Sequence, residues 1–143
     1  MQARHIAALA RIEQQCFSAP WSEQALSAEL GKGLFLVAER DGQPVGYVGC
    51  QTVLDEGYIT NVAVQPQARR QGVARALLAA LEREGRRKGL AFVTLEVRVS
   101  NEAAIALYRG AGYEPAGRRK GFYQNPKEDA LLMTCYLNGK ELT

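Results

Sequence analysis

One short basic segment, RRQGVAR at residues 69–75, has the residue types and spacing that bind phosphate groups. It joins an expected strand to an expected helix, and a helix N-terminus presents unpaired N–H groups and about half a positive charge. Gly72 and the small Ala74 allow a ligand to approach the backbone closely, and three arginines add positive charge. The segment therefore predicts a pyrophosphate cradle, with a solvated basic helix start as the alternative. It is neither a Walker A loop nor a GxGxxG dinucleotide loop.

Two residues further along the chain have side chains suited to moving protons. Glu96 lies near the end of an apolar segment that reads as a strand, where α/β folds hold their ligands. Its other interpretation is a surface glutamate paired with Arg98, two residues on along the same strand face. Tyr108 lies on an expected helix, where a packed core aromatic is the alternative, and Ser100 or Asn101 is expected to cap that helix.

The elements that must position these residues alternate between strands and helices. Apolar residues three and four apart predict helices over residues 4–17, 22–30 and 71–88, and from the cap at 100–101 to about residue 110. Strands are expected over residues 34–39, 45–53, 58–64, 91–97, 113–119 and 130–137. The first three strands form an antiparallel meander, with Asp41-Gly42 as a hairpin turn. This order predicts an α/β (α+β) fold with helices on both faces of one sheet.

Composition bounds the class of protein. The chain has 143 residues, of which 47% are hydrophobic and 23% charged, and this fits one globular domain over residues 1–143. Its 18 basic and 15 acidic residues give a net charge of +3. That charge is too small to predict nucleic-acid binding, but it is compatible with an anionic small ligand.

Cysteine and histidine usage excludes several kinds of site. Cys16, Cys50 and Cys135 are far apart, and His5 is the only histidine. We therefore expect no metal site and no Ser-His-Asp or Cys-His catalytic unit. Unpaired thiols favour a reducing cytoplasm. No apolar run approaches the ~20 residues that span a bilayer, so we expect no membrane association.

Several motifs in order resemble one enzyme family. The run NVAVQPQARRQGVARALLAALE from Asn61 resembles the acetyl-CoA loop of the GNAT N-acetyltransferase superfamily, with its R/Q-x-x-G-x-G/A signature at Arg69, Gly72 and Ala74. The run TLEVRVSNEAAIALYRGAGY from Thr94 resembles the next strand and helix. The segments PWSE and RRKGFYQNPKEDALLM are similar to the RimI-like family of ribosomal-protein-alanine N-acetyltransferases.

The resemblance implies acetyl-CoA as cosubstrate and an amine as acetyl acceptor. It implies Glu96 as general base and Tyr108 as general acid. A carboxylate acting through a water suffices as base, because an α-amine has a pKa of about 7.7–8.0. The residues implied to bind acetyl-CoA are Val62, Ala63, Val64, Arg69, Arg70, Gln71, Gly72, Val73, Ala74, Arg75 and Asn101.

The resemblance also implies a fold and a partner. The fold is a mixed antiparallel and parallel twisted sheet flanked by helices. Its first strand is expected to be absent or truncated, because the helical pattern begins almost at Met1. The implied acceptor is the N-terminal peptide, beginning with alanine, of the eighteenth protein of the small ribosomal subunit. We expect a monomer with no direct nucleic-acid partner.

The acceptor side is less specific in the sequence. Three aromatic residues (Trp21, Phe122 and Tyr123) and three acidic residues (Glu23, Glu128 and Asp129) are candidates for a groove that holds a basic peptide, with packing and solvated surface as the alternatives. Three other functions stay open. They are acetylation of a small-molecule amine or a lysine, an acyl-CoA-binding module without turnover, and a small RNA-binding protein.

Overall fold

A computed structural model describes residues 1–137, so residues 138–143, which the sequence assigns to the same domain, lie outside the described residues. One six-stranded sheet with the order β1-β2-β3-β4-β6-β5 forms the centre. Its strands are β1 (Leu34–Arg40), β2 (Gln43–Val53), β3 (Glu56–Val64), β4 (Phe92–Arg98), β5 (Glu114–Tyr123) and β6 (Glu128–Tyr136). The helices are α1 (Ile6–Cys16), α2 (Glu23–Ser27), α3 (Val73–Arg87) and α4 (Glu102–Gly110).

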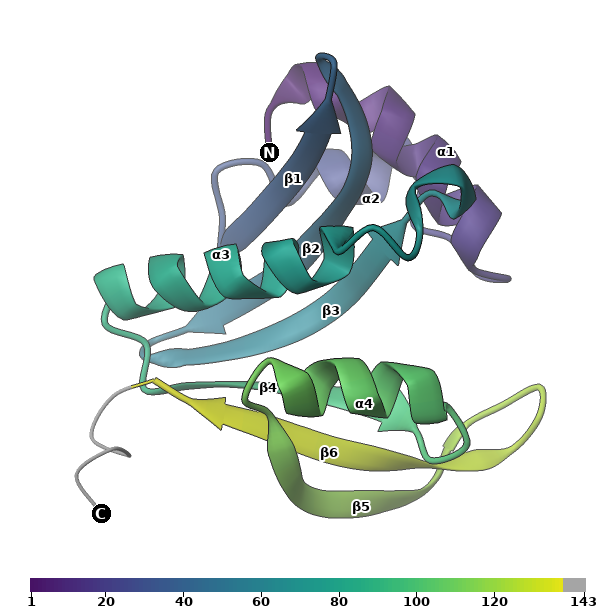
Figure 1. The fold of residues 1–143 in the computed structure, drawn as a ribbon, viewed down its shortest axis with the longest axis vertical. Coiled ribbons are helices and arrows are strands. Elements are labelled where there is room, and N and C mark those ends of the chain that lie inside the picture. Colours follow the sequence, from purple (N-terminus) through teal and green to yellow (C-terminus); the bar gives the residue numbers. More distant parts are fainter. Residues whose placement is uncertain (138–143) are drawn as a thin grey trace.

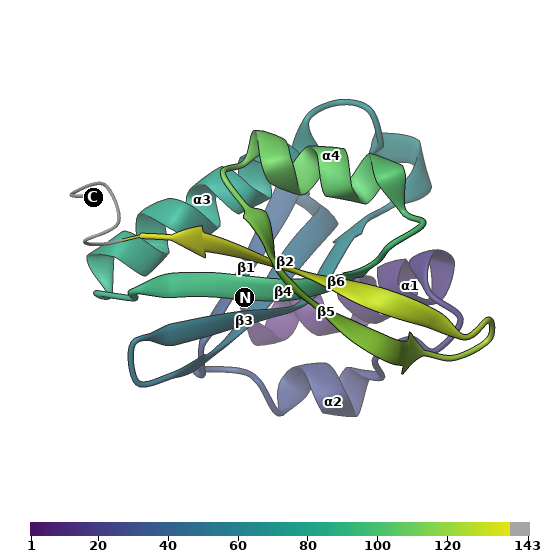
Figure 2. The ribbon, with the colours of Figure 1, turned by 90° about the horizontal axis from the view of Figure 1, so that it is seen from below.

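The helices cover the sheet in two layers. Figure 2 shows α3 and α4 on one face and α1 and α2 on the other. One hydrophobic core lies between the sheet and α3, with Leu77, Leu78 and Leu81 buried among strand residues such as Val48 and Leu95. A second core lies beneath α1 and α2. The mixed sheet with helices on both faces confirms the predicted fold class.

Local sequence signals place several element ends as expected. Asp41 and Gly42 both have positive φ, 53° and 78°, as a tight turn between twisted strands requires. Ser22 caps α2 by accepting a hydrogen bond from the Ala25 N–H at 3.0 Å. The helix itself is shorter than predicted, because after Ser27 the chain tightens into turns such as the bond from Leu30 N–H to the Ser27 carbonyl.

The chain start also follows the expectation. A single 3₁₀ turn (Ala3–His5) leads into α1, and no strand precedes that helix within residues 1–137. The strand β1 therefore forms one edge of the described sheet. No helix in this part of the chain has the length and apolar character needed to cross a membrane.

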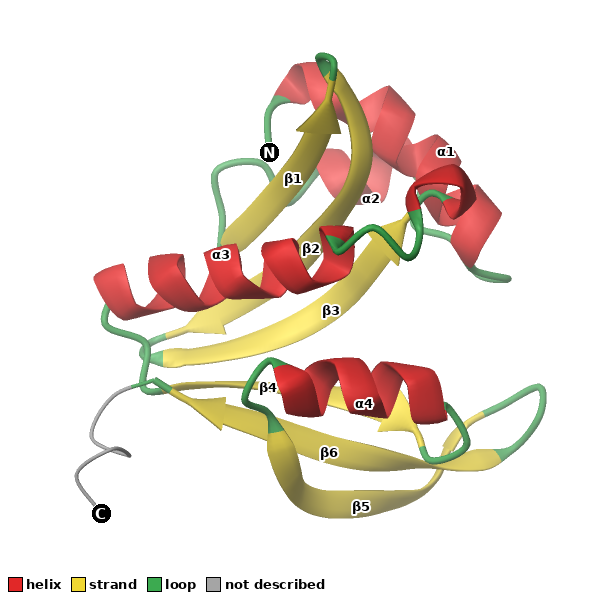
Figure 3. Ribbon diagram, viewed as in Figure 1, coloured by secondary structure: helices red, strands yellow, loops and turns green. Residues whose placement is uncertain are grey.

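The sheet opens in the middle, and this opening creates the site. The parallel strands β3 and β4 pair only at Glu56–Phe92, Gly57–Val93 and Tyr58–Thr94. Beyond these pairs β3 continues along β2 and β4 continues along β6, so the two halves diverge as a V (Figure 1). Figure 3 shows that the loops entering α3 and α4 both lie at the open end.

Candidate active site

A cavity of about 630 Å³ occupies the opening between β3 and β4. Eight of the predicted site residues line it, namely Val62, Ala63, Val64, Arg69, Ala74, Glu96, Asn101 and Tyr108. They come from four places in the sequence: the end of β3, the loop into α3, the end of β4 and the helix α4. The divergence of the two strands thus brings the candidate base, the candidate acid and the β3 backbone to one hollow.

The backbone at the end of β3 presents polar groups to this gap. The N–H of Gln65 donates to the Val45 carbonyl on β2 at 2.8 Å. Because backbone groups alternate in direction along a strand, those of Ala63 also face β2, and those of Val62 and Val64 face the gap. The Val64 carbonyl already accepts hydrogen bonds from Arg69 Nε at 3.1 Å and Cys16 Sγ at 3.4 Å. The Val62 groups and the Val64 N–H therefore remain the ones suited to pair with an extended ligand.

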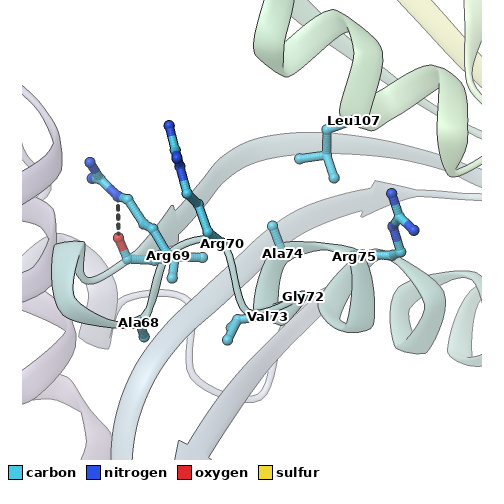
Figure 4. A pocket seen from close by; sticks show the side chains of 9 residues that line it. Ala68, Arg69, Arg70, Gly72, Val73, Ala74, Arg75 and Leu107 are labelled. Atoms are coloured by element: carbon cyan, nitrogen blue, oxygen red, sulfur yellow. Dashed lines mark hydrogen bonds between the residues drawn. The ribbon is translucent and has the colours of Figure 1, made fainter.

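The basic loop forms a second hollow of about 410 Å³ directly beside the first. Of the predicted residues, all of residues 69–75 except Gln71 line it, and the Gln71 amide instead donates to the Gln67 carbonyl at 3.2 Å. Figure 4 shows the side chains of Arg70, from the loop, and Arg75, from the first turn of α3, projecting toward the side on which Leu107 of α4 lies. Arg69 instead turns back to the backbone.

The start of α3 has the features of an anion site. Its first intrahelical bond runs from the Ala76 N–H to the Gly72 carbonyl at 3.0 Å, so the preceding N–H groups of the first turn have no partner within the helix. Gly72 has a φ of 80°, and a Cβ built there would meet no protein atom within 4 Å. The loop therefore offers open space, free N–H groups and cationic side chains, which is what a pyrophosphate needs.

The side chain of Glu96 is nearly buried and only 5% exposed. Its hydrogen-bond and ion-pair partners do not include Arg98, the partner considered in the alternative interpretation of the sequence. One carboxylate oxygen accepts a hydrogen bond from the Tyr58 hydroxyl, and the other lies 2.6 Å from Arg119 Nε on β5. The pairing with Arg98 is wrong, because Arg98 binds Glu128 at 3.1 Å.

Tyr108 and Asn101 lie on α4, on the other side of the gap from β3. The Tyr108 ring packs edge-on against Tyr113, with 5.9 Å between ring centroids. Burial, with a smaller contribution from Tyr123, raises the pKa of Tyr108 to about 12, so the phenol keeps its proton at neutral pH. Asn101 rather than Ser100 caps the helix, since its side-chain oxygen accepts from the Ala104 N–H at 3.1 Å.

The comparisons with known proteins agree with this geometry. The model of the acetyltransferase (GNAT) family matches residues 6–113. The chain belongs to the GNAT acetyltransferase family. Over 136 residues it is 38% identical to the [ribosomal protein bS18]-alanine N-acetyltransferase of Escherichia coli K12, covering 93% of this chain and 92% of that protein.

Solved structures give the same result. The crystal structure of the ribosomal-protein-S18-alanine N-acetyltransferase from Escherichia coli aligns with a TM-score of 0.88 at 36% identity, over 96% of this chain and 90% of that one. The ribosomal-protein-alanine N-acetyltransferase from Brucella melitensis aligns with a TM-score of 0.80 at 30% identity, over 96% and 97%. The predicted resemblance and the enzyme class, an N-acetyltransferase, are confirmed.

GNAT acetyltransferases take their acetyl group from acetyl-CoA, and the two adjoining hollows fit this molecule chemically. The loop at residues 69–75 suits its pyrophosphate, and the gap-facing groups of Val62 and Val64 suit the amides of its pantetheine arm. The individual binding residues stay predictions. Among residues 1–137, no three His, Cys, Asp or Glu side chains gather as a metal ion would require.

Replacing Gly72 with valine is expected to raise the Kd for acetyl-CoA by about tenfold or more, since a lost phosphate contact is worth ~1.5–3 kcal/mol. A β-branched residue is strained at a φ of 80°, and its side chain would enter the space assigned to the phosphates. Calorimetric titration with acetyl-CoA measures this. Gly89→Val is the matched control, because Gly89 has a φ of 78°, is equally open and lies beyond the far end of α3. Equal affinity in both variants would contradict the cradle.

Three residues that the sequence analysis did not select help to build the site. Glu13 on α1 is fully buried and accepts hydrogen bonds from the Trp21 N–H, the Tyr47 hydroxyl and the Asn61 amide at 2.8, 2.6 and 3.0 Å. It therefore ties the loop after α1 to β3 where β3 leaves β4. A signal was present, since Glu13 follows Leu9 by four residues on the apolar stripe of α1.

The remaining two, Tyr58 and Arg119, are the partners of Glu96. Nothing in the sequence shows which residues lie opposite Glu96 on the neighbouring strands. Their roles follow only from the register of the sheet.

The candidates for the acceptor groove separate into two groups. Tyr123 lines the cavity, and Arg98 lies over its ring at 4.5 Å. Trp21 instead packs against Phe35. The position of Trp21 fits the packing alternative. Glu128 is 15% exposed and is engaged by Arg98 and by the Ser100 N–H, so it is not the solvated surface residue of the other alternative.

Proposed function

We propose that this protein transfers the acetyl group of acetyl-CoA to the N-terminal α-amine of a small-subunit ribosomal protein that begins with alanine, in the cytoplasm. The observation that carries the proposal is the meeting of Glu96 and Tyr108 in one cavity at the opened sheet, beside the basic loop. The names of the relatives that are 30–38% identical over most of the chain support this choice of acceptor.

Each step of the transfer has a residue suited to it. Glu96 accepts the proton of the acceptor ammonium through a water, which is an inexpensive step because an α-ammonium has a pKa of about 7.7–8.0. The Val62 N–H donates to the carbonyl under attack, where negative charge develops. Tyr108 donates its proton to the departing sulfur, since burial keeps the phenol protonated at neutral pH. Acetyl-CoA supplies the acetyl group and leaves as CoA.

A thiol-release assay with acetyl-CoA and three acceptors tests the proposal. The acceptors are a peptide that begins with alanine and arginine, the same peptide with its α-amine blocked and a lysine added, and spermine. We expect turnover with the first peptide alone. Turnover with the blocked peptide or spermine alone would show a different amine acceptor, and acetyl-CoA binding without any turnover would contradict the acceptor class.

A further inference from the structure

The carboxylate of Glu96, the general base of the proposed mechanism, is already paired with a basic side chain of the same protein, Arg119. Among the residues that line the 630 Å³ cavity, Glu96 is the one acidic side chain. Its Oε2 lies 2.6 Å from Arg119 Nε, and only 5% of the Glu96 side chain is exposed. An amine approaching through the cavity therefore meets a carboxylate whose charge is already compensated.

The position of Arg119 allows its side chain to move away from Glu96 into solvent. Arg119 lies on β5, the edge strand of the sheet, and its side chain is 58% exposed. Its guanidinium carbon also lies 5.8 Å from the centre of the Phe122 ring. The pairing of β5 with β6 is irregular between Arg119 and Tyr123, so the backbone just after Arg119 is not held in a regular ladder.

The second arginine at this site is built differently. Arg98 is 29% exposed and bonds Glu128 and the carbonyls of Pro126 and Gln124, and its guanidinium lies over the Tyr123 ring. Four contacts hold Arg98, at the end of β4, against the β5–β6 hairpin. Arg119 has one ion pair, and its own end of that pair is 58% exposed, so water competes for the guanidinium although Glu96 is nearly buried.

The incoming acceptor has the same charge as Arg119. A protein N-terminus near neutral pH is largely an ammonium group, which seeks a carboxylate and is repelled by a cation a few ångströms away. We propose that Arg119 holds the acceptor-ammonium position in the free enzyme and that the acceptor must displace it from Glu96 to bind. Arg119 is thus an internal competitor that weakens the binding of every amine acceptor to Glu96. This inference rests on the proposed function.

If the acceptor displaces Arg119, removing Arg119 should change the KM for the acceptor but not kcat. An ion pair that only holds Glu96 in place would not give this result. In Arg119→Gln the competitor is gone, so the KM for the peptide acceptor should fall by at least about two- to fivefold, the worth of an exposed ion pair, because Glu96 is nearly buried and its pair is worth no less. The kcat should stay within about twofold, because Arg119 has already left in the saturated complex. The KM for acetyl-CoA should not change.

Two matched variants control the experiment. Arg118→Gln removes the same charge from the neighbouring residue, which is 61% exposed and pairs with Asp129 at 3.3 Å, and it should leave the peptide KM unchanged. Arg119→Lys retains a cation of similar reach and should stay near wild type. Calorimetric titration of the peptide into the enzyme saturated with CoA measures the same affinity without turnover, and a thermal melt confirms that each variant is folded.

The possible results are distinct. An unchanged or raised peptide KM in Arg119→Gln, or a tenfold loss of kcat, would overturn the inference and assign Arg119 to holding Glu96 in place. A wild-type enzyme that neither acetylates nor binds an α-amine peptide would overturn the proposed function, and the inference with it. A wild-type enzyme that is active on α-amines, with unchanged affinity in Arg119→Gln, overturns the inference alone.

Discussion

Glu96→Gln is expected to lower kcat with an alanine-first peptide by about 10²–10⁴-fold, the usual contribution of a positioned general base. Glutamine has nearly the same shape and can still accept a hydrogen bond from the Tyr58 hydroxyl, so the packing around β4 should persist. It cannot take a proton from the acceptor. Because the groups proposed to bind acetyl-CoA lie mainly on β3 and in residues 69–75, the affinity for acetyl-CoA should not change. Steady-state kinetics and acetyl-CoA titration separate these effects.

The pH dependence makes the prediction for Glu96 sharper. As the pH rises above the α-amine pKa of about 7.7–8.0, more of the acceptor arrives already deprotonated and the need for a base falls. The difference between wild type and Glu96→Gln should therefore shrink from pH 7 to pH 9. Glu56→Gln, an exposed glutamate outside the cavity at the start of β3, is the control and should behave as wild type. Full activity of Glu96→Gln across this range would show that another group is the base.

The sequence predicted features that depend on a few neighbouring residues. The Asp41-Gly42 turn, the Ser22 cap and the Asn101 cap each need a side chain or a φ value at one position, and each is present. The helices and strands followed in the same way from apolar periodicity. The basic loop was found because a phosphate cradle is a local motif, readable from residues 69–75 alone.

Features that depend on register could not be read from the sequence. The alternative interpretation of Glu96 paired it with Arg98 on its own strand, but the side chains that reach it come from β3 and β5, 38 positions before it and 23 after it. The point where β3 and β4 separate is likewise a property of two strands and their helices. Periodicity indicates which face a residue occupies, but not what stands opposite it.

Buried polar side chains are a second kind of feature that the sequence could not predict. Glu13 lies on the buried side of α1, where a carboxylate without partners would cost several kcal/mol. Three donors from a loop, β2 and β3 satisfy it. Since two of these donors are more than 30 residues away, the sequence cannot distinguish such a residue from an error in the apolar pattern.

Tyr108→Phe is the second substitution with a large expected effect, a fall in kcat of about 10²–10⁴-fold from the loss of a general acid. Without the phenol the sulfur must leave as a thiolate, with no positioned donor to neutralise the negative charge that develops on it. The ring remains, so the contact with Tyr113 and the shape of α4 should persist. Single-turnover kinetics with saturating acetyl-CoA measure the chemical step directly.

Two further observations distinguish an acid from a packing residue. Burial raises the pKa of Tyr108 to about 12, so its acidic form persists to high pH and wild-type kcat should not decline between pH 7 and pH 10 through loss of this proton. Tyr113→Phe is the matched control, because Tyr113 is also buried and its pKa is also raised, yet it is not among the residues that line the cavity. If both variants lost kcat equally, the cause would be packing of the Tyr108–Tyr113 pair. A loss confined to Tyr108→Phe, with unchanged acetyl-CoA affinity, would assign the proton donation to the Tyr108 hydroxyl.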